Sequence, residues 1–357
     1  MTKKRILVTG GAGFVGSNMA LNFKRSYGEN AEVVSLDNLK RRGSELNITR
    51  LKSGGVDFFH GDIRQIEDIR AVGDIDLIVE CSAEPSVLAG YNSSPDYLMQ
   101  TNLQGTINCL DIARATQADF IFLSTSRVYP IKTINELRYR ESDTRFKLEE
   151  GQDIPGVTKR GFSEEMSLSG VRSLYGATKL CSELIIQEYI EMYNIRGVIN
   201  RCAVLTGPWQ MGKIDQGVIV LWVARHLFGG ELGYFGYGGT GKQVRDILHV
   251  EDLFQLLITQ YKNIDKHNGQ VYNVGGGREV SLSLCELTGL CEKFSGKKIK
   301  INAVKETRVA DIPYYITDNS KVEQSTGWSP SISKESIIEE ITGWVSDNKS
   351  LLKDILS

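Results

Sequence analysis

Short apolar, β-branched runs alternate with stretches of helical periodicity through the first half of the chain. The runs that predict strands are Arg5–Thr9, Glu32–Asp37, Asp57–His60, Leu77–Cys81 and Phe120–Thr125. The segments between them place apolar residues at helical spacing. Such alternation is typical of parallel strands joined by crossover helices. We therefore expect an α/β fold with a Rossmann-type doubly wound parallel sheet, in which ligands bind at the carboxyl ends of the strands.

The second half of the chain has a less regular pattern. Residues 131–170 are polar and charged with little periodicity, and we expect a lid there because Tyr175 follows directly. Further on, the pattern predicts strands at Gly197–Val204, Leu232–Phe235 and Gln270–Asn273, and helices at Tyr175–Tyr193, Leu282–Lys293 and Lys334–Asp347. We expect one domain over residues 1–200, with 131–170 as an insertion. A smaller mixed α/β lobe should span 201–357, with some chain crossing back.

Charge and composition narrow the function further. The 357 residues carry a formal net charge of −2 with no arginine-rich tail, which argues against a nucleic-acid partner. No apolar run is long enough for a secretory signal or a membrane span. The six cysteines are scattered without Cys-x-x-Cys spacing, so they predict reduced thiols and no metal site. We expect a cytoplasmic protein without a membrane partner.

A glycine-rich turn follows the first predicted strand. Gly10, Gly13 and Gly16 stand between that strand and a helix. Glycines at this spacing allow a tight turn, the approach of backbone to a pyrophosphate, and close helix–strand packing. The pyrophosphate would meet free N–H groups and the positive end of the helix dipole. The turn predicts dinucleotide binding.

An acidic residue ends the second predicted strand. Asp37, followed by Asn38, could accept hydrogen bonds from both hydroxyls of an adenosine ribose and repel a 2′-phosphate, which favours NAD over NADP. The basic run Lys40–Arg42 could hold such a phosphate, or be a solvated charge run. Asp62, after the third strand, could reach the adenine amino group or cap a helix.

A tyrosine and a lysine lie four residues apart on the long predicted helix. This spacing puts Tyr175 and Lys179 on one face. A free tyrosine, with a pKa of about 10, is a poor base at neutral pH, but a nearby ammonium stabilises the phenolate. Thr125, at the end of a strand, could polarise a substrate oxygen. We predict these three residues to be catalytic.

Together these features resemble the extended short-chain dehydrogenase/reductase family, whose members bind NAD and oxidise or epimerise nucleotide sugars. The resemblance implies an NAD-dependent isomerase and a homodimer or homotetramer. It implies cofactor contacts at Gly10, Gly13, Phe14, Val15, Gly16, Asp37, Asn38, Arg42, Asp62, Ile63, Ser82, Ala83, Asn102, Tyr175, Lys179 and Cys202. One departure is Glu80, where many relatives carry histidine.

The resemblance also implies a substrate site. Arg245 would meet the substrate diphosphate, since a guanidinium pairs two phosphate oxygens; alternatively it pairs with Asp246. Tyr234 and Phe235 would lie on a strand that runs past the nucleotide base of the substrate; alternatively they are core aromatics. The implied substrate residues are Glu84, Thr125, Gln216, Tyr234, Arg245, Arg308 and Asp311.

Several runs are most similar to family members that invert carbon 2 of a CDP-linked hexose. They are Glu84–Gly90, Arg172–Lys179, Leu205–Lys213 and Asp215–Gly217. The alternatives are a UDP-sugar 4-epimerase, which needs the same residues, and a dehydratase or reductase of the family. A dehydratase commonly has an Asp-Glu pair after the catalytic threonine, where this chain has Ser126 and Arg127. A non-catalytic NAD sensor would be expected to lack Tyr175 or Lys179.

Overall fold

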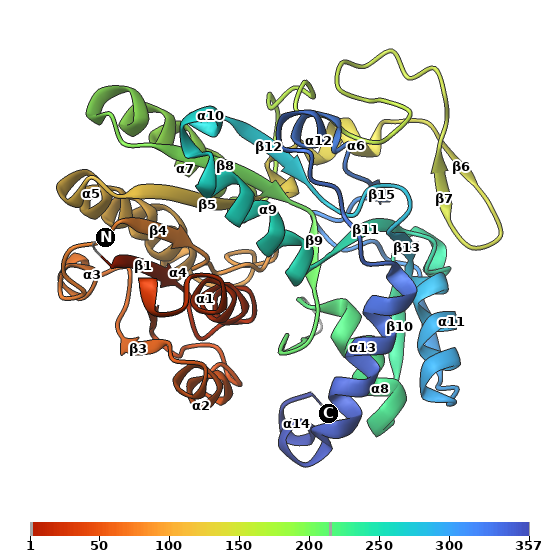
Figure 1. The fold of residues 1–357 in the computed structure, drawn as a ribbon. Coiled ribbons are helices and arrows are strands. Elements are labelled where there is room, and N and C mark those ends of the chain that lie inside the picture. The colour runs from red at the N-terminus through yellow and green to blue at the C-terminus, as the bar shows by residue number, and fades with distance from the viewer. Residues whose placement is uncertain (1–2, 214–215, 357) are drawn as a thin grey trace. The chain divides into compact units, whose positions relative to one another are not determined.

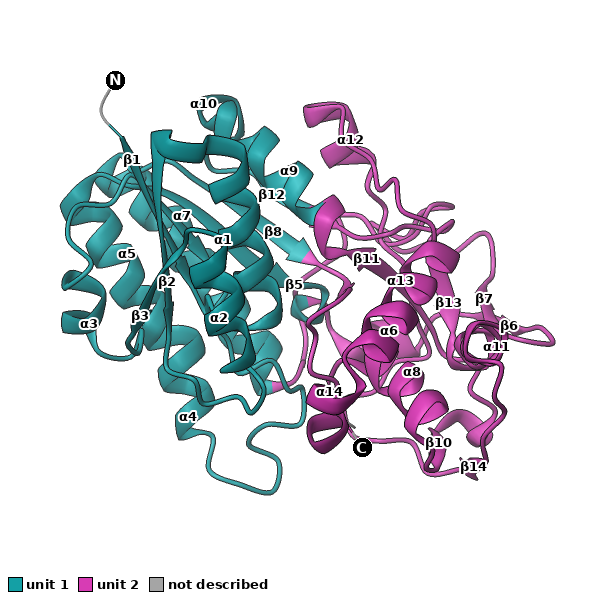
Figure 2. Cartoon of the chain, turned by 60° about the horizontal axis from the view of Figure 1, so that its bottom comes forward, with its two compact units in different colours: residues 1–128, 174–201, 253–272 teal, residues 129–173, 202–252, 273–357 magenta. Residues whose placement is uncertain are grey.

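The computed structural model describes residues 3–213 and 216–356, so Asp215 lies outside the described residues. The chain forms two compact units, each built from three segments (Figure 2). The first unit consists of residues 1–128, 174–201 and 253–272, and the second of 129–173, 202–252 and 273–357. The segment 131–170, which interrupts the first unit in sequence, belongs to the second unit, and the chain returns to the first unit over residues 253–272.

A seven-stranded sheet forms the centre of the first unit (Figure 1). Across the sheet its strands are β12 (Val271–Val274), β8 (Gly197–Cys202), β5 (Asp119–Thr125), β4 (Leu77–Glu80), β1 (Lys4–Thr9), β2 (Ala31–Asp37) and β3 (Asp57–His60). The pairs β1–β2, β1–β4, β2–β3 and β4–β5 are parallel. The strand order reverses direction between β1 and β4, which is where doubly wound sheets bind ligands. The predicted fold class is confirmed.

Helices cover this sheet and bury its apolar side chains. The elements are α1 (Phe14–Tyr27), η1 (Gly28–Asn30), α2 (Leu46–Ser53), α3 (Ile66–Arg70), α4 (Asp96–Met99), η2 (Gln100–Gln104), α5 (Gly105–Thr116), η3 (Ser126–Val128), α7 (Leu174–Tyr193), α9 (Val250–Lys262) and α10 (Ile264–His267). Helices α3, α5 and α7 pack together over one core that includes Leu7, Ile78 and Phe120. Helix α1 packs on α2 and, through Phe23, on Phe254 of α9.

The second unit has smaller sheets and more connecting chain. Its elements are α6 (Ile131–Asn135), β6 (Tyr139–Glu141), β7 (Phe146–Leu148), β9 (Val204–Thr206), α8 (Val218–Phe228), β10 (Leu232–Phe235), η4 (Tyr237–Gly239), β11 (Val244–His249), β13 (Ser281–Ser283), α11 (Leu284–Ser295), β14 (Ile301–Val304), β15 (Tyr314–Tyr315), α12 (Ser320–Thr326), α13 (Lys334–Asp347) and α14 (Lys349–Leu356). Strand β11 lies between β13 and β15 and also pairs with β9. Strands β10 and β14 form a parallel pair, and β6 and β7 an antiparallel hairpin.

Two predicted elements differ from the structure for local reasons. The single strand expected over 197–204 is two strands, β8 and β9, which join different sheets. The helix expected from Leu282 begins at Leu284, because Ser283 caps it: the Ser283 hydroxyl accepts the N–H of Glu286, and the Glu286 side chain accepts the N–H of Ser283. Among the residues that the structure describes, no helix has the length and apolarity needed to cross a membrane.

Candidate active site

The glycine turn between β1 and α1 leaves no room for side chains. A Cβ on Gly16 would lie 2.2 Å from the Gly10 carbonyl oxygen, and one on Gly10 would lie 2.9 Å from the backbone of Cys81. Gly10 also has φ of +61°, which disfavours other residues. Gly13 precedes α1 without a side-chain cap, so the first N–H groups of the helix can serve an anion. This cradle fits a pyrophosphate.

Asp37 lies at the end of β2, beside the glycine turn. Its carboxylate accepts the N–H of Leu39 at 2.7 Å and the N–H of Ala12 at 3.1 Å. Burial raises the pKa of Asp37, and these backbone donors oppose the rise. The fixed carboxylate suits the hydroxyls of a ribose and disfavours a phosphate there. Residues of the cradle and Asp37 therefore fit NAD.

Asp62, the predicted adenine contact, is already engaged. Arg64 donates to both of its oxygens, with Nη2 at 2.6 Å from Oδ2, and Asn38 donates to Oδ2 at 2.9 Å. Burial raises the pKa of Asp62, but these donors outweigh burial, and the pKa is lowered overall. Lys40 and Arg64 both lie over the ring of Tyr97, with Lys40 Nζ 3.3 Å from its centroid. These contacts join the segment after β2 to the segment after β3.

Asn102 lies in the π-helical turn η2, a rare conformation that is frequent at functional sites. It is fully buried, and its side chain accepts the N–H of Glu84 at 2.7 Å and donates to the Glu84 carbonyl at 3.0 Å. It also lies 3.4 Å from the Thr178 hydroxyl on α7. Asn102 therefore holds the loop with Ser82, Ala83 and Glu84 in place.

The tyrosine and lysine predicted to be catalytic lie at the start of α7. Tyr175 is half-buried, whereas Lys179 is only 2% exposed and its ammonium lies 4.1 Å from the centroid of the Phe122 ring. Glu80 is fully buried; burial raises its pKa to about 7, although the nearby Lys179 charge and a hydrogen bond from Thr106 lower it. The ammonium is thus held in an apolar setting close to a carboxyl group.

Thr125 ends β5, and the turn that follows it contacts α7. The Thr125 hydroxyl accepts the N–H of Arg127 at 3.2 Å, which fixes it at the carboxyl edge of the sheet. Beside it, the Ser124 hydroxyl donates to Glu183 of α7. Glu183 in turn forms a buried ion pair with Arg201 of β8 at 2.7 Å. This network ties β5, α7 and β8 together.

Sequence reasoning missed the network and the partners of Glu80. Glu183 lies on the buried face of α7. A charged residue at a position predicted to be buried usually has a partner, and this could have indicated the network. Arg201, the partner of Glu183, lies in a strand with mostly apolar residues, which is a second signal. The proximity of Glu80 to Lys179 joins residues far apart in sequence, and no local pattern indicates it.

The remaining predicted cofactor residues differ in exposure. Arg42 is exposed, whereas Ile63 and Cys202 are buried. The carbonyl of Ile63 accepts a hydrogen bond from Asn108 at 2.8 Å, so its backbone fixes the loop after β3. Cys202 lies at the end of β8, within the second unit.

Two of the predicted substrate residues of the second unit, Arg308 and Asp311, line a cavity of about 330 Å³. Phe235, Arg308 and Asp311 line it, and the Arg308 guanidinium lies 3.9 Å from the Phe235 ring centroid. Arg245 pairs with Asp311 at 3.0 Å and not with Asp246, so that alternative is wrong. An aromatic ring under a guanidinium is a surface on which a base can stack.

Two other predicted substrate residues are placed differently. Tyr234 does not line this cavity: its hydroxyl lies 2.7 Å from the Thr288 hydroxyl and its ring stacks on Trp222. It is a core aromatic, and only its neighbour Phe235 faces the cavity. Gln216 is half-buried and pairs through its backbone with Lys213. Among the described residues, no group of three or more His, Cys, Asp and Glu side chains could hold a metal ion.

These features are those of a dinucleotide-binding oxidoreductase fold with a tyrosine–lysine site. The sequence model of the NAD dependent epimerase/dehydratase family matches residues 6–275. The chain belongs to this family of enzymes, and NAD, the predicted cofactor, is confirmed as the cofactor of the family.

Relatives span nearly the whole chain. The chain is 30% identical over 353 residues to the CDP-paratose 2-epimerase of Salmonella typhi, covering 96% of this chain and 99% of that protein. It is 27% identical to the dTDP-glucose 4,6-dehydratase of Neisseria meningitidis, covering 99% and 96%. A solved dTDP-glucose 4,6-dehydratase double mutant from Streptomyces venezuelae, with NAD bound, matches with a TM-score of 0.78 and 26% identity, covering 98% and 99%.

Proposed function

We propose that the protein epimerises a nucleotide sugar through a transient keto sugar. The observation that carries the proposal is the position of Tyr175 one helical turn before a buried Lys179 on α7. An ammonium held in an apolar setting acts strongly on nearby charge, because the local dielectric is low. It therefore stabilises a phenolate one helical turn away and makes the tyrosine a base.

Each catalytic side chain has one task. Tyr175 takes the proton of a sugar hydroxyl and later returns it, while Lys179 balances the phenolate charge. The Thr125 hydroxyl donates to the same sugar oxygen and polarises it. NAD, when bound, would supply the acceptor, and then the donor, of the hydride at the carbon that bears this hydroxyl. The reaction has no net redox change, since the sugar turns its other face to the cofactor between the two transfers.

We propose CDP-paratose and CDP-tyvelose, interconverted at carbon 2, as the substrates. The support is the 30% identity to a CDP-paratose 2-epimerase over nearly the whole chain. Arg308 and Phe235 would hold the nucleotide, and Arg245 its diphosphate. A UDP-sugar 4-epimerase is the alternative. A dehydratase is disfavoured by Ser126 and Arg127, which stand where an acid–base pair is expected.

The test follows carbon 2 by NMR while the purified protein acts on CDP-paratose in deuterated water. Inversion without deuterium uptake at carbon 2 is the expected result, because the hydride returns internally. Deuterium at the inverted carbon would mean proton abstraction and would overturn the redox mechanism. Turnover of UDP-glucose but not of CDP-paratose would support the 4-epimerase instead.

Removing one phenol tests the assignment of the base. Tyr175→Phe should lower kcat by at least about 100-fold, the usual size of a general-base contribution, with NAD binding retained. Tyr193→Phe, on the same helix, is the matched control and should keep wild-type activity. A fully active Tyr175→Phe variant would show that another group is the base, and equal NAD binding by both variants excludes misfolding as the cause.

The cytoplasmic location and the homo-oligomeric state also belong to this proposal. The exposed residues Leu184 and Met192 on α7 would offer apolar surface to a second copy of the chain.

A further inference from the structure

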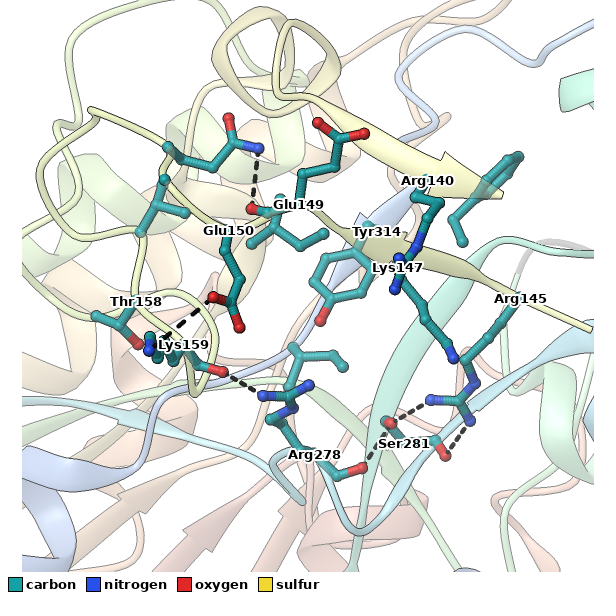
Figure 3. Close-up of a pocket in the computed structure, with 16 residues that line it drawn as sticks. Arg140, Arg145, Lys147, Glu149, Glu150, Thr158, Lys159, Arg278, Ser281 and Tyr314 are labelled. Atoms are coloured by element: carbon teal, nitrogen blue, oxygen red, sulfur yellow. Dashed lines mark hydrogen bonds and ion pairs between the residues drawn. The ribbon is translucent and has the colours of Figure 1, made fainter. Parts of the chain in front are cut away.

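A second cavity, of about 580 Å³, lies within the second unit (Figure 3). Its walls come from the β6–β7 hairpin, the loop after it, and strands β13 and β15, and we call it the hairpin cavity. It shares no lining residue with the cavity at Phe235 and Arg308. None of the predicted cofactor, substrate or catalytic residues lines it, so the proposed function leaves it without a role.

The lining of the hairpin cavity is rich in cations. It includes two carboxylates, Glu149 and Glu150, and five cations: Arg140, Arg145, Lys147, Lys159 and Arg278. Arg145 is balanced by Glu286, which accepts from its Nε at 2.7 Å. Lys159 lies 4.0 Å from Glu150, and both side chains are more than four-fifths exposed. The cationic charge of the lining therefore exceeds its anionic charge.

Three of these cations have no counter-charge. Within residues 3–213 and 216–356, no carboxylate lies within ion-pairing distance of Arg140, Lys147 or Arg278. Arg278 uses one guanidinium nitrogen on the Lys159 carbonyl, at 2.6 Å, and this contact carries no opposite charge. The cavity thus has cationic donors on two sides: Arg140 and Lys147 on the hairpin, and Arg278 opposite them.

The hairpin places two of the cations directly opposite each other. Arg140 pairs with Lys147 in the antiparallel register of β6 and β7. Side chains at such positions share one face of the hairpin with Cβ atoms about 5 Å apart, and like charges there are destabilising. An anion bound between them would remove this repulsion, so the hairpin gains from a ligand.

A tyrosine hydroxyl completes the site. Tyr314 is only 6% exposed, and its ring packs on Tyr139 and Phe162. Its hydroxyl borders the cavity and, among the described residues, has no hydrogen-bond partner (Figure 3). Burial raises the pKa of Tyr314 to about 12, so the hydroxyl keeps its proton at neutral pH. A donor held in place at the cavity wall suits a ligand that supplies an acceptor.

We propose that the hairpin cavity binds a small anion with two phosphoryl groups. A phosphoryl group offers three oxygens in different directions, which suits donors that converge from the hairpin and from the opposite strands. Arginine pairs two of those oxygens at once, and lysine adds a compact charge. A cavity of this volume is larger than one phosphate requires and lies in the range of metabolite sites.

Binding should order the hairpin as well as fill the cavity. The ligand bridges β6 and β7 to Arg278 and Tyr314, which lie more than a hundred residues further along the chain. It would therefore couple the segment 131–170 to the strands β13 and β15. Amide hydrogens of residues 139–148 should exchange more slowly when the ligand is bound.

Calorimetry with inorganic pyrophosphate, on the NAD-loaded protein, tests the proposal. Arg140→Ala/Lys147→Ala should weaken binding by at least about tenfold, since each change removes a charge-assisted hydrogen bond, and Tyr314→Phe should weaken it by about threefold. Lys262→Ala/Lys353→Ala removes the same charge from exposed helix surfaces and is the matched control, which should bind as the wild type does. Orthophosphate should bind more weakly than pyrophosphate.

Each other outcome counts against the proposal. No pyrophosphate binding by the wild type, or equal binding by both double variants, would overturn the site. Citrate binding as tightly as pyrophosphate would overturn the choice of phosphoryl groups. Hydrogen exchange places the ligand: slower exchange at 139–148 supports the hairpin cavity, and slower exchange only around Gly10–Gly16 would assign the binding to the cofactor cradle. The varied side chains of the hairpin are exposed, so their removal leaves the core intact.

Discussion

Glu80 combines full burial with one unpaired oxygen. Thr106 donates to Oε1 at 2.7 Å, whereas Oε2 has no partner among the described residues. Many members of the family that this sequence resembles have histidine there, so the chain replaces a neutral ring by an acid next to Lys179. A carboxyl group in this setting keeps its proton to a higher pH than in water, because burial disfavours its charged form.

A consequence for stability follows from the sign of that shift. The folded pKa of Glu80, about 7, lies above the value of 4.5 of a free glutamate. Between these pH values the unfolded chain loses the proton first, so the free energy of unfolding falls as the pH rises, by up to about 3 kcal/mol. The Glu80→Gln variant has no such carboxyl group, so its free energy of unfolding should not show this decrease with pH. Urea unfolding at pH 5 and pH 8 should show the variant gaining stability relative to the wild type at the higher pH.

The matched control is Glu188→Gln, an exposed position on α7. Its stability relative to the wild type should be the same at both pH values. If Glu80→Gln also tracked the wild type at both, the buried carboxyl would be ionised throughout, and the raised pKa would be wrong.

At the scale of elements, the β1–turn–α1 unit tests the cofactor cradle. In Gly16→Ala the new Cβ would lie 2.2 Å from the Gly10 carbonyl oxygen and 2.8 Å from Gly11 Cα, so the turn must open. NAD affinity should fall by at least about tenfold, because the helix N-terminus moves away from the pyrophosphate. Calorimetry with NAD measures the loss.

Gly289→Ala provides the control, since that glycine lies in α11 with nothing within 4 Å of a new Cβ. It should leave NAD affinity unchanged and raise stability by about 0.5–1 kcal/mol, as alanine suits a helix better than glycine. Wild-type NAD affinity in Gly16→Ala would show that the turn does not hold the cofactor.

The sequence predicted the elements correctly where the apolar residues of the pattern are also the buried ones. Strand β3 and helix α13 have the predicted bounds, and β1, β2, β4 and β5 differ by one residue at one end. Strand β11 was not predicted, because Arg245 and Asp246 interrupt its apolar pattern. Their partners, Asp311 and the Gly277 N–H, lie far along the chain, and only the folded structure brings them together. The same limit hid the Asn102–Glu84 contact within the site.

At the scale of the whole molecule, each unit depends on segments from both halves of the sequence. A fragment of residues 1–200 lacks α9, although Phe23 of α1 is fully buried and packs edge-on against Phe254 at 5.2 Å. The fragment also lacks β12, which leaves β8 as an open sheet edge. It should aggregate or fail to unfold cooperatively.

Denaturant unfolding and light scattering of the fragment measure this. Coexpression with residues 201–357 should restore a soluble complex, since that chain supplies α9 and β12. A monomeric fragment with a cooperative transition would instead mean that the first 200 residues fold without the returning segment.

The interleaved division of the chain also bears on synthesis and on evolution. The polypeptide passes between the units five times, after residues 128, 173, 201, 252 and 272. During translation the large sheet gains its final strand only when β12 leaves the ribosome, so about three-quarters of the protein emerges before the first unit is whole. A gene rearrangement with one breakpoint therefore cannot exchange either unit intact.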